Sequence, residues 1–257
     1  MATESARYMF AGHAIGAAAQ FHRLDEAENL NHVIPTLGAT VLPVTGGRSE
    51  SRLDKPYRYD VDSPRKRCLF SVDRIDSWAE GRQRNNRYET ELSIEIAGLD
   101  IVEKLHFDLV RLHMHSARAA SADPVVTTRG NRIEGMRLGN VEARVTIDDE
   151  PLTFAGTDDQ LTGYYRSRGQ ATQQVGPHVT SSIIRRIELI GSEQDKQPMS
   201  VNGNVIVWDG FGRIILGEIH VKGHERRLTM VRLAMGSDAG GSGAAGDGQS
   251  NGDTTGG

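Results

Sequence analysis

The chain has 257 residues, enough for one large domain or two small ones, and a formal net charge of −4. The part before Gly236 is close to neutral, so the composition gives no specific signal for nucleic-acid binding. No apolar run reaches the about 18 residues that a membrane-spanning helix needs, which excludes a helical span.

β-Strands dominate the expected elements, because short apolar runs with period-two alternation recur between turn signals. The clearest is Tyr88–Ala97, "YETELSIEIA", which places aliphatic side chains on one face and three glutamates on the other. The other expected strands, in chain order, are Ala14–Leu24, Ala39–Leu42, Leu69–Ile75, Leu105–His115, Val141–Ile147, Ser182–Ile190, Asn204–Trp208, Arg213–Val221 and Leu228–Met235. Turn signals, "NGN" at 202–204 and "DGFG" at 209–212, separate strands near the C-terminal end.

The other expected segments are one helix, two long loops and a disordered tail. The one helix candidate is Thr157–Ser167, because Thr157 can cap it and two aspartates follow at its positive end. Long polar loops are expected over 46–67 and 116–130. The tail from Gly236 is rich in glycine and holds no large apolar residue, so we expect it to be disordered.

Four short matches occur in the same order in two halves of the chain, which predicts an internal duplication. The first half gives "FAGHAIG" at 10–16, "RID" at 74–76, "EKLHF" at 103–107 and "VRLHMHS" at 110–116. The second gives "IEGMRLG" at 133–139, "RIE" at 186–188, "EIHV" at 218–221 and "VRLAMGS" at 231–237. Chance similarity among amphipathic strands is the alternative.

The expected fold is therefore all-β, with two related antiparallel halves that resemble a β-sandwich or barrel, one short helix and a disordered C-terminal tail. The expected segments are an N-terminal arm (1–9), a first β half (10–118), a linker loop (119–130), a second β half (131–235) and the tail (236–257).

His113 and His115 are the candidate metal ligands. Their two-residue spacing on a strand places both imidazoles on one face, where they could supply two of the three or four ligands of a metal site. The second copy of this strand keeps the apolar residues but has Ala234 and Gly236 at the histidine positions. The apolar face, with Val110, Leu112 and Met114, is therefore expected to be core, and a solvated histidine pair is the alternative to a metal site.

Three further residues are candidates for ligand binding. Arg111 is retained in the second copy, and a guanidinium can bind carboxylate or phosphate in a bidentate manner. Trp78 and Trp208 are the two tryptophans and could stack on a carbohydrate. The apolar run around Cys68, the single cysteine, predicts a buried thiol rather than a nucleophile.

No nucleophile elbow, phosphate-binding loop, zinc-protease motif or cysteine cluster occurs in the sequence. We therefore expect a non-catalytic binding or assembly protein whose partner is another copy of itself or another protein. The alternatives are a metal-dependent enzyme centred on His113 and His115, and a carbohydrate-binding β-sandwich. No cofactor is expected apart from that possible metal ion. We expect a cytoplasmic protein; the alternative is secretion, because the N-terminus faintly imitates a signal peptide.

Overall fold

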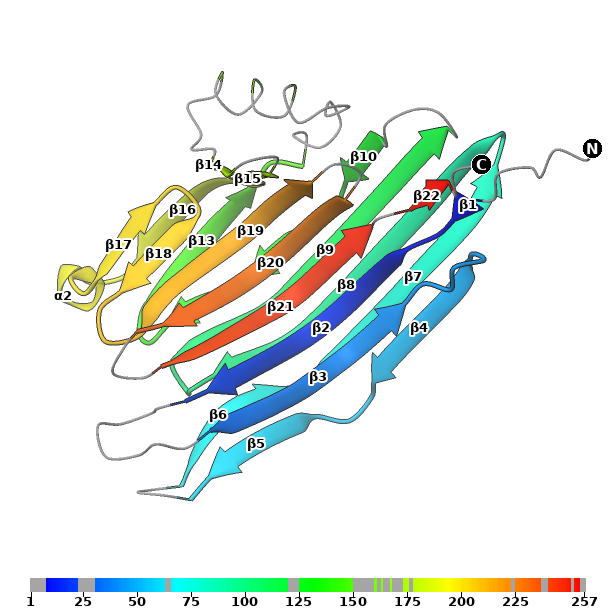
Figure 1. The fold of residues 1–257 in the computed structure, drawn as a ribbon. Helices are drawn as coiled ribbons and strands as arrows, with labels where there is room; N and C mark the ends of the chain where they lie inside the picture. Colours follow the sequence, from blue (N-terminus) through cyan, green and yellow to red (C-terminus); the bar gives the residue numbers. More distant parts are fainter. Residues whose placement is uncertain are drawn as a thin grey trace, which may run out of the picture.

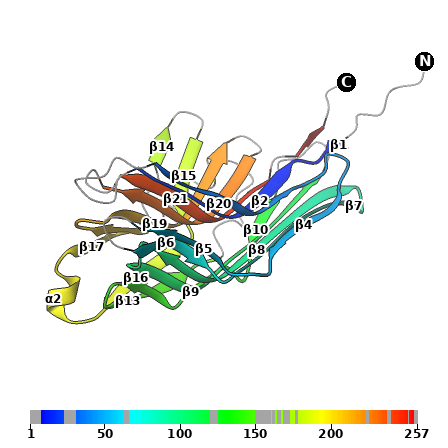
Figure 2. The ribbon, with the colours of Figure 1, turned by 90° about the horizontal axis from the view of Figure 1, so that it is seen from below.

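The structure is a computed structural model of the chain. It describes residues 8–22, 31–62, 66–119, 125–149, 173–175, 178–222, 225–236, 240–250 and 252–254, with the single positions 160, 163 and 167. Two antiparallel sheets lie face to face as a sandwich, which Figure 1 shows from the side of the smaller sheet and Figure 2 from below. The expected all-β fold is confirmed.

The larger sheet has 11 strands. They are β4 (Gly47–Leu53), β5 (Tyr57–Val61), β6 (Arg67–Val72), β7 (Arg74–Arg84), β8 (Arg87–Ile101), β9 (Leu105–Ala119), β10 (Val125–Thr128), β11 (Arg132–Glu134), β12 (Met136–Leu138), β13 (Val141–Ile147) and β16 (Ile184–Ile190). Its centre is the long hairpin of β8 and β9, flanked by β7 and then by the edge strand β4 on one side.

The smaller sheet has nine strands. They are β2 (Gly12–Phe21), β3 (His32–Val41), β14 (Gln173–Val175), β15 (His178–Ser182), β17 (Met199–Asn202), β18 (Val205–Trp208), β19 (Gly212–Lys222), β20 (Glu225–Met235) and β21 (Gly241–Ser250). Both expected turns of its C-terminal part are confirmed, because β17, β18 and β19 follow one another as antiparallel hairpins. A separate two-stranded ribbon joins β1 (Tyr8–Met9) to β22 (Asp253–Thr254).

The core lies between the sheets, where the alternating strands turn their aliphatic faces inward. Leu92, Ile94 and Ile96 of β8 are fully buried, and Leu112 of β9 lies beside them. The expected apolar stripes of β9 and β20 are both part of this core: Val110, Leu112, Met114, Val231 and Leu233 are at most 4% exposed. No helix in the described part of the chain is long and apolar enough to cross a bilayer.

Each sheet takes strands from both of the expected halves. The N-terminal β2 and β3 complete the smaller sheet beside β21, whereas β13 and β16 extend the larger sheet. β9 and β20, which carry the strongest of the four sequence matches, are inner strands of opposite sheets. The sheets therefore do not divide at the expected linker, and the duplication itself stays a prediction.

The structure corrects three expectations about loops and the tail. Residues 46–67 form β4 and β5, and the expected loop over 116–130 includes the end of β9 and all of β10. The tail was expected to be disordered, but Gly241–Ser250 form β21, which is hydrogen-bonded to β20 on one side and β2 on the other. The described helix is α2 (Glu193–Lys196), whereas the expected helix at Thr157–Ser167 lies mostly outside the described residues.

Candidate functional site

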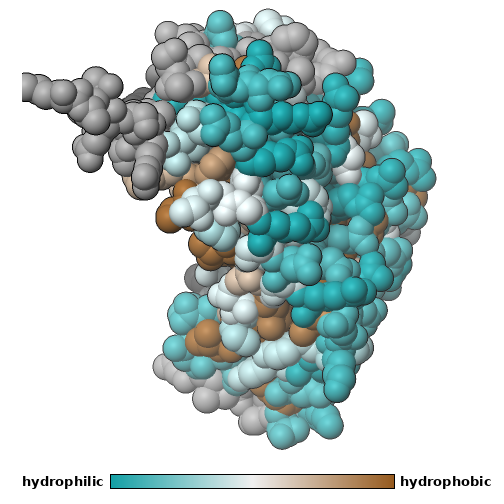
Figure 3. All heavy atoms as spheres, turned by 90° about the vertical axis from the view of Figure 1, so that its right-hand side faces the viewer, coloured by the Kyte–Doolittle hydropathy of each residue, from teal (hydrophilic) through white to brown (hydrophobic). Residues whose placement is uncertain are grey.

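Four of the five candidate residues project from the outer face of the larger sheet. Arg111, His113 and His115 come from β9 and Trp78 comes from β7. Their side chains are half-buried and alternate with the buried core positions of the same strands. Hydrophilic side chains cover the right-hand side of the molecule in Figure 3, where this face is seen edge-on. We call this surface the polar face.

A two-residue turn fixes which charges meet across the polar face. Asn85 and Asn86 have φ angles of 51° and 58°, the left-handed conformation that a tight hairpin between β7 and β8 needs. The resulting register sets Glu80 directly opposite Glu91. Two carboxylates in this position repel each other unless a cation lies between them.

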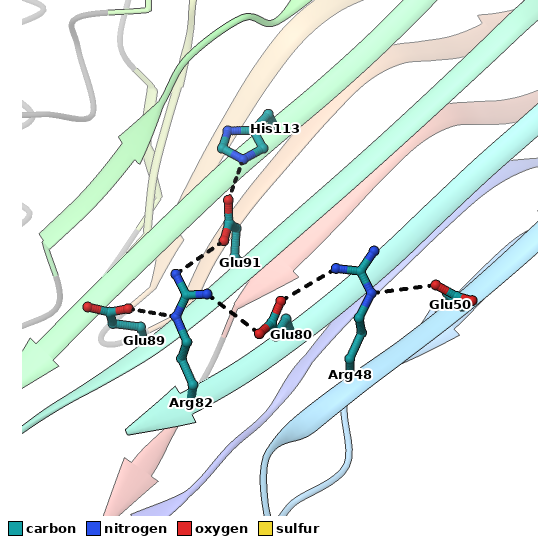
Figure 4. Close-up of polar contacts among 7 residues, drawn as sticks. All are labelled: Arg48, Glu50, Glu80, Arg82, Glu89, Glu91 and His113. Atoms are coloured by element: carbon teal, nitrogen blue, oxygen red, sulfur yellow. Dashed lines mark hydrogen bonds and ion pairs between the residues drawn. The ribbon is translucent and has the colours of Figure 1, made fainter. Parts of the chain in front are cut away.

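Arg82 supplies that cation (Figure 4). Its Nε donates to Glu89 at 2.9 Å, and its two terminal nitrogens lie 3.5 Å from Glu80 and 3.6 Å from Glu91. The hydrogen bond to Glu89 raises the pKa of Arg82, and the charges of Glu80 and Glu91 act in the same direction. Arg48 of β4 continues the row, with one nitrogen 3.5 Å from Glu80 and another 3.5 Å from Glu50. Positive and negative groups therefore alternate across three strands.

His113 ends this row and is held at two points. Its Nε2 lies 2.9 Å from Glu91 Oε1, and its backbone N–H donates to Asn131 Oδ1 at 2.7 Å. Trp78 lies next to it, with its ring centroid 6.5 Å from that of His113 and 4.4 Å from the guanidinium carbon of Arg48. The imidazole and the indole are therefore both in contact with charged neighbours.

His115 faces the same side as His113, opposite Glu91 and Thr127 of the neighbouring strands. Among the residues that the structure describes, no group of three or more His, Cys, Asp or Glu side chains is arranged to hold a metal ion. The expected geometry of the pair is thus present, and its role as a pair of metal ligands stays a prediction.

Arg111 is engaged by a carboxylate of the neighbouring strand. Two of its nitrogens donate to Glu95, and Arg74 donates to the same carboxylate at 2.7 Å. The hydrogen bond from Arg111 lowers the pKa of Glu95; burial acts in the opposite direction, and Arg74 adds to the lowering. The guanidinium that was a candidate for ligand binding is therefore paired within the chain.

Trp208 lies away from the other candidates, at the end of β18 in the smaller sheet. Its ring stacks on Phe211 with centroids 4.8 Å apart. Both rings line an open hollow with a cavity volume of about 440 Å³, next to Arg213 and Met235. The two tryptophans therefore come from different sheets and do not form one aromatic platform.

A charged cluster that the sequence does not predict lies on the outer side of the smaller sheet. Asp247 of β21 is 3% exposed and accepts hydrogen bonds from Arg227 Nε at 2.7 Å, Arg227 Nη2 at 2.9 Å and Thr229 Oγ1 at 2.6 Å. His13 Nε2 lies 3.8 Å away. Burial raises the pKa of this carboxyl, but His13, Arg227 and Thr229 outweigh that effect and lower it to about 2. The one signal in the sequence was an aspartate within a glycine-rich tail.

The contact between His113 and Glu91 is expected to contribute little to stability. Both side chains remain partly exposed, at 29% and 24%, so solvent screens their interaction. In a double-mutant cycle with His113→Ala and Glu91→Ala, we expect a coupling energy below about 1 kcal/mol from urea denaturation. A coupling of several kcal/mol would show instead that this pair holds β8 and β9 together.

Comparison with known proteins gives one match. No curated protein and no solved structure matches the chain. A family model described as a domain of unknown function (DUF8256) matches residues 8–181, which is more than half of the chain and includes β1 to β14, with every strand of the polar face except β16. The chain therefore belongs to the family of the domain of unknown function DUF8256.

Proposed function

We propose that this protein is a non-catalytic assembly protein, which associates with further copies of itself through its β-sheet surfaces. The observation that carries the proposal is the pairing of charges on the polar face. Arg82 and Arg111 each lie against carboxylates of neighbouring strands, and His113 lies against Glu91. Side chains paired in this way are occupied by one another and are poorly placed to exchange protons with a substrate.

The pKa shifts support a structural role for these pairs. The hydrogen bond from His106 lowers the pKa of Asp108, and the one from Arg111 lowers the pKa of Glu95. The hydrogen bond to Glu89 raises the pKa of Arg82, and the one to Asp247 raises the pKa of Arg227. Each shift moves the group further from neutral pH. General acid–base catalysts show the opposite tendency, because their pKa values are moved toward the working pH.

The composition of the exposed surface also favours protein association. Arginine and tryptophan are enriched at protein interfaces. On the polar face, the guanidinium of Arg48 lies over the ring of Trp78. On the side of the smaller sheet, Val33, Val41 and Val44 are more than half exposed. Val33 and Val41 lie at opposite ends of β3, so they are single exposed residues, and Arg48 and Trp78 are the surface residues that favour association.

Size-exclusion chromatography with light scattering tests the proposal on the full chain. We expect a molar mass that is a multiple of the 28.1 kDa of one chain and that falls on dilution. A mass of one chain at every concentration would overturn the proposal. If this monomer also held a stoichiometric metal ion that is lost in the His113→Ala, His115→Ala variant, the metal-dependent alternative would replace it.

A further inference from the structure

β4 forms an edge of the larger sheet. Among the described strands it pairs only with β7, and it lies at the rim of the molecule in Figure 1. An edge strand offers unpaired backbone N–H and C=O groups, to which the strand of another chain can be added. Its outward side chains are therefore the ones that decide what can pair with it.

Four charged side chains of alternating sign follow this edge. Arg48, Glu50 and Arg52 lie at alternate positions of β4, and Asp54 directly follows it. Their side chains are exposed by 47, 76, 63 and 69%. Charged side chains commonly protect an edge strand against pairing, and charges of one sign would repel a second copy at every position. Alternating charges are instead able to match a second copy that runs in the opposite direction.

We propose that β4 pairs antiparallel with β4 of a second copy of this chain, about a twofold axis at Ser51. This inference rests on the proposed self-association and names its surface. With Ser51 opposite the partner's Ser51, Arg48 faces the partner's Asp54 and Glu50 faces the partner's Arg52. The twofold axis repeats both pairs, so all four charges meet an opposite charge.

Neighbouring registers lack this match. Moving the axis by one residue to Glu50 places Arg48 opposite the partner's Arg52, and Glu50 opposite the partner's Glu50. Moving it to Arg52 pairs Glu50 with the partner's Asp54, and Arg52 with the partner's Arg52. Like charges directly opposite each other destabilise an antiparallel pair, so the pattern selects the register at Ser51.

The contacts that these charges make within one chain are weak enough to be exchanged. Arg48 lies 3.5 Å from both Glu50 and Glu80. Arg52 contacts Asp54 and lies 3.0 Å from Asp76 of β7, and all of these pairs are partly or largely exposed. Exposed ion pairs of this kind contribute little, because water solvates both partners. Strand β3 packs beside β4, and Val44, 63% exposed, precedes β4, so apolar surface adjoins the paired edge.

Two charge-reversal variants test the pairing. Arg48→Glu with Arg52→Glu makes the edge entirely acidic, and Glu50→Arg with Asp54→Arg makes it entirely basic. Each variant alone is expected to lose the dimer, whereas an equimolar mixture is expected to form a mixed dimer, because all four positions are then complementary. Sedimentation velocity measures the masses, and circular dichroism checks that each variant is folded.

A matched control reverses two arginines elsewhere on the same sheet. Arg144 and Arg186, on the adjacent strands β13 and β16, have side chains that are 65 and 70% exposed. Arg144→Glu with Arg186→Glu is expected to leave the mass of the wild type unchanged. If the wild type assembles but the β4 variants assemble equally well, the β4 pairing is wrong and the proposed self-association stands. If the wild type is a monomer at every concentration, both are wrong.

Discussion

Replacing Asp247 with asparagine is expected to lower the free energy of unfolding by about 2–4 kcal/mol. The carboxylate is almost fully buried and accepts two hydrogen bonds from Arg227 and one from Thr229. An asparagine can keep the bond from Thr229, but it lacks the charge and the second acceptor oxygen that Arg227 requires. Urea denaturation at neutral pH, followed by tryptophan fluorescence, measures the loss.

The same substitution should remove part of the acid sensitivity of the fold. The pKa of Asp247 falls from 3.8 to about 2 on folding. A carboxyl whose pKa is lowered by folding stabilises the native state above its unfolded pKa, and this contribution is lost as the pH falls through the folded value. Roughly 2 kcal/mol of wild-type stability should therefore disappear between about pH 4 and pH 2, and the difference from Asp247→Asn should shrink over that interval.

An exposed aspartate of the same sheet supplies the control. Asp209 lies in the turn between β18 and β19, and Asp209→Asn is expected to change stability by less than about 0.5 kcal/mol. Equal stabilities of Asp247→Asn and the wild type would show that the cluster does not hold β21. Amide hydrogen exchange separates a local from a global effect, because detachment of β21 alone would release the protection of Gly241–Ser250 first.

The strands that the sequence predicts well are those with one apolar and one polar face. Tyr88–Ala97 and Leu105–His115 fall within β8 and β9, and Val141–Ile147 coincides with β13. The missed strands lack that signal. β4 carries charges at alternate positions and only one large apolar residue, Leu53, because an edge strand needs little apolar surface.

β21 is missed for a different reason. Its inward positions are glycine and alanine, and the volume they leave is filled by large side chains of the opposite sheet. A Cβ added to Gly248 would lie 3.0 Å from Leu112 Cδ2. The strand is held by backbone hydrogen bonds to two neighbours and by Asp247. The hydrophobicity of the segment predicts neither these backbone hydrogen bonds nor the contacts of Asp247.

The sequence predicts which face of a strand each candidate residue occupies, but it does not predict which residues that side chain contacts. Alternation alone places His113 and His115 together on the outer side of β9. Glu91 contacts both Arg82 and His113 because of two strand registers, and the turn at Asn85 and Asn86 sets only the one between β7 and β8. Trp208 and Trp78 are separated because consecutive segments of the chain are distributed between two sheets, and no local pattern records that division.

Replacing Gly38 with alanine is expected to destabilise the protein by about 2–4 kcal/mol. Gly38 lies in β3 with a φ of +61°, and a Cβ there would be 2.3 Å from Cγ2 of Ile75, which is fully buried. A Cβ on Gly16 of β2 would approach the same methyl group to 2.5 Å. The two glycines thus form a recess that receives Ile75 from the larger sheet. Thermal or urea denaturation measures the loss.

Gly203→Ala separates the effect of the backbone angle from that of the recess. Gly203 has a similar φ of +58° with no atom within 4 Å of its added Cβ, so alanine should cost only about 1 kcal/mol there. Ile75→Leu removes Cγ2 at nearly constant volume, and it should lessen the effect of Gly38→Ala when the two are combined. Equal losses at Gly38 and Gly203, or strictly additive effects of Gly38→Ala and Ile75→Leu, would contradict the recess. The Ser77 hydroxyl donates to the Gly38 carbonyl at 2.7 Å in the wild type, so this junction joins the sheets by both packing and a hydrogen bond.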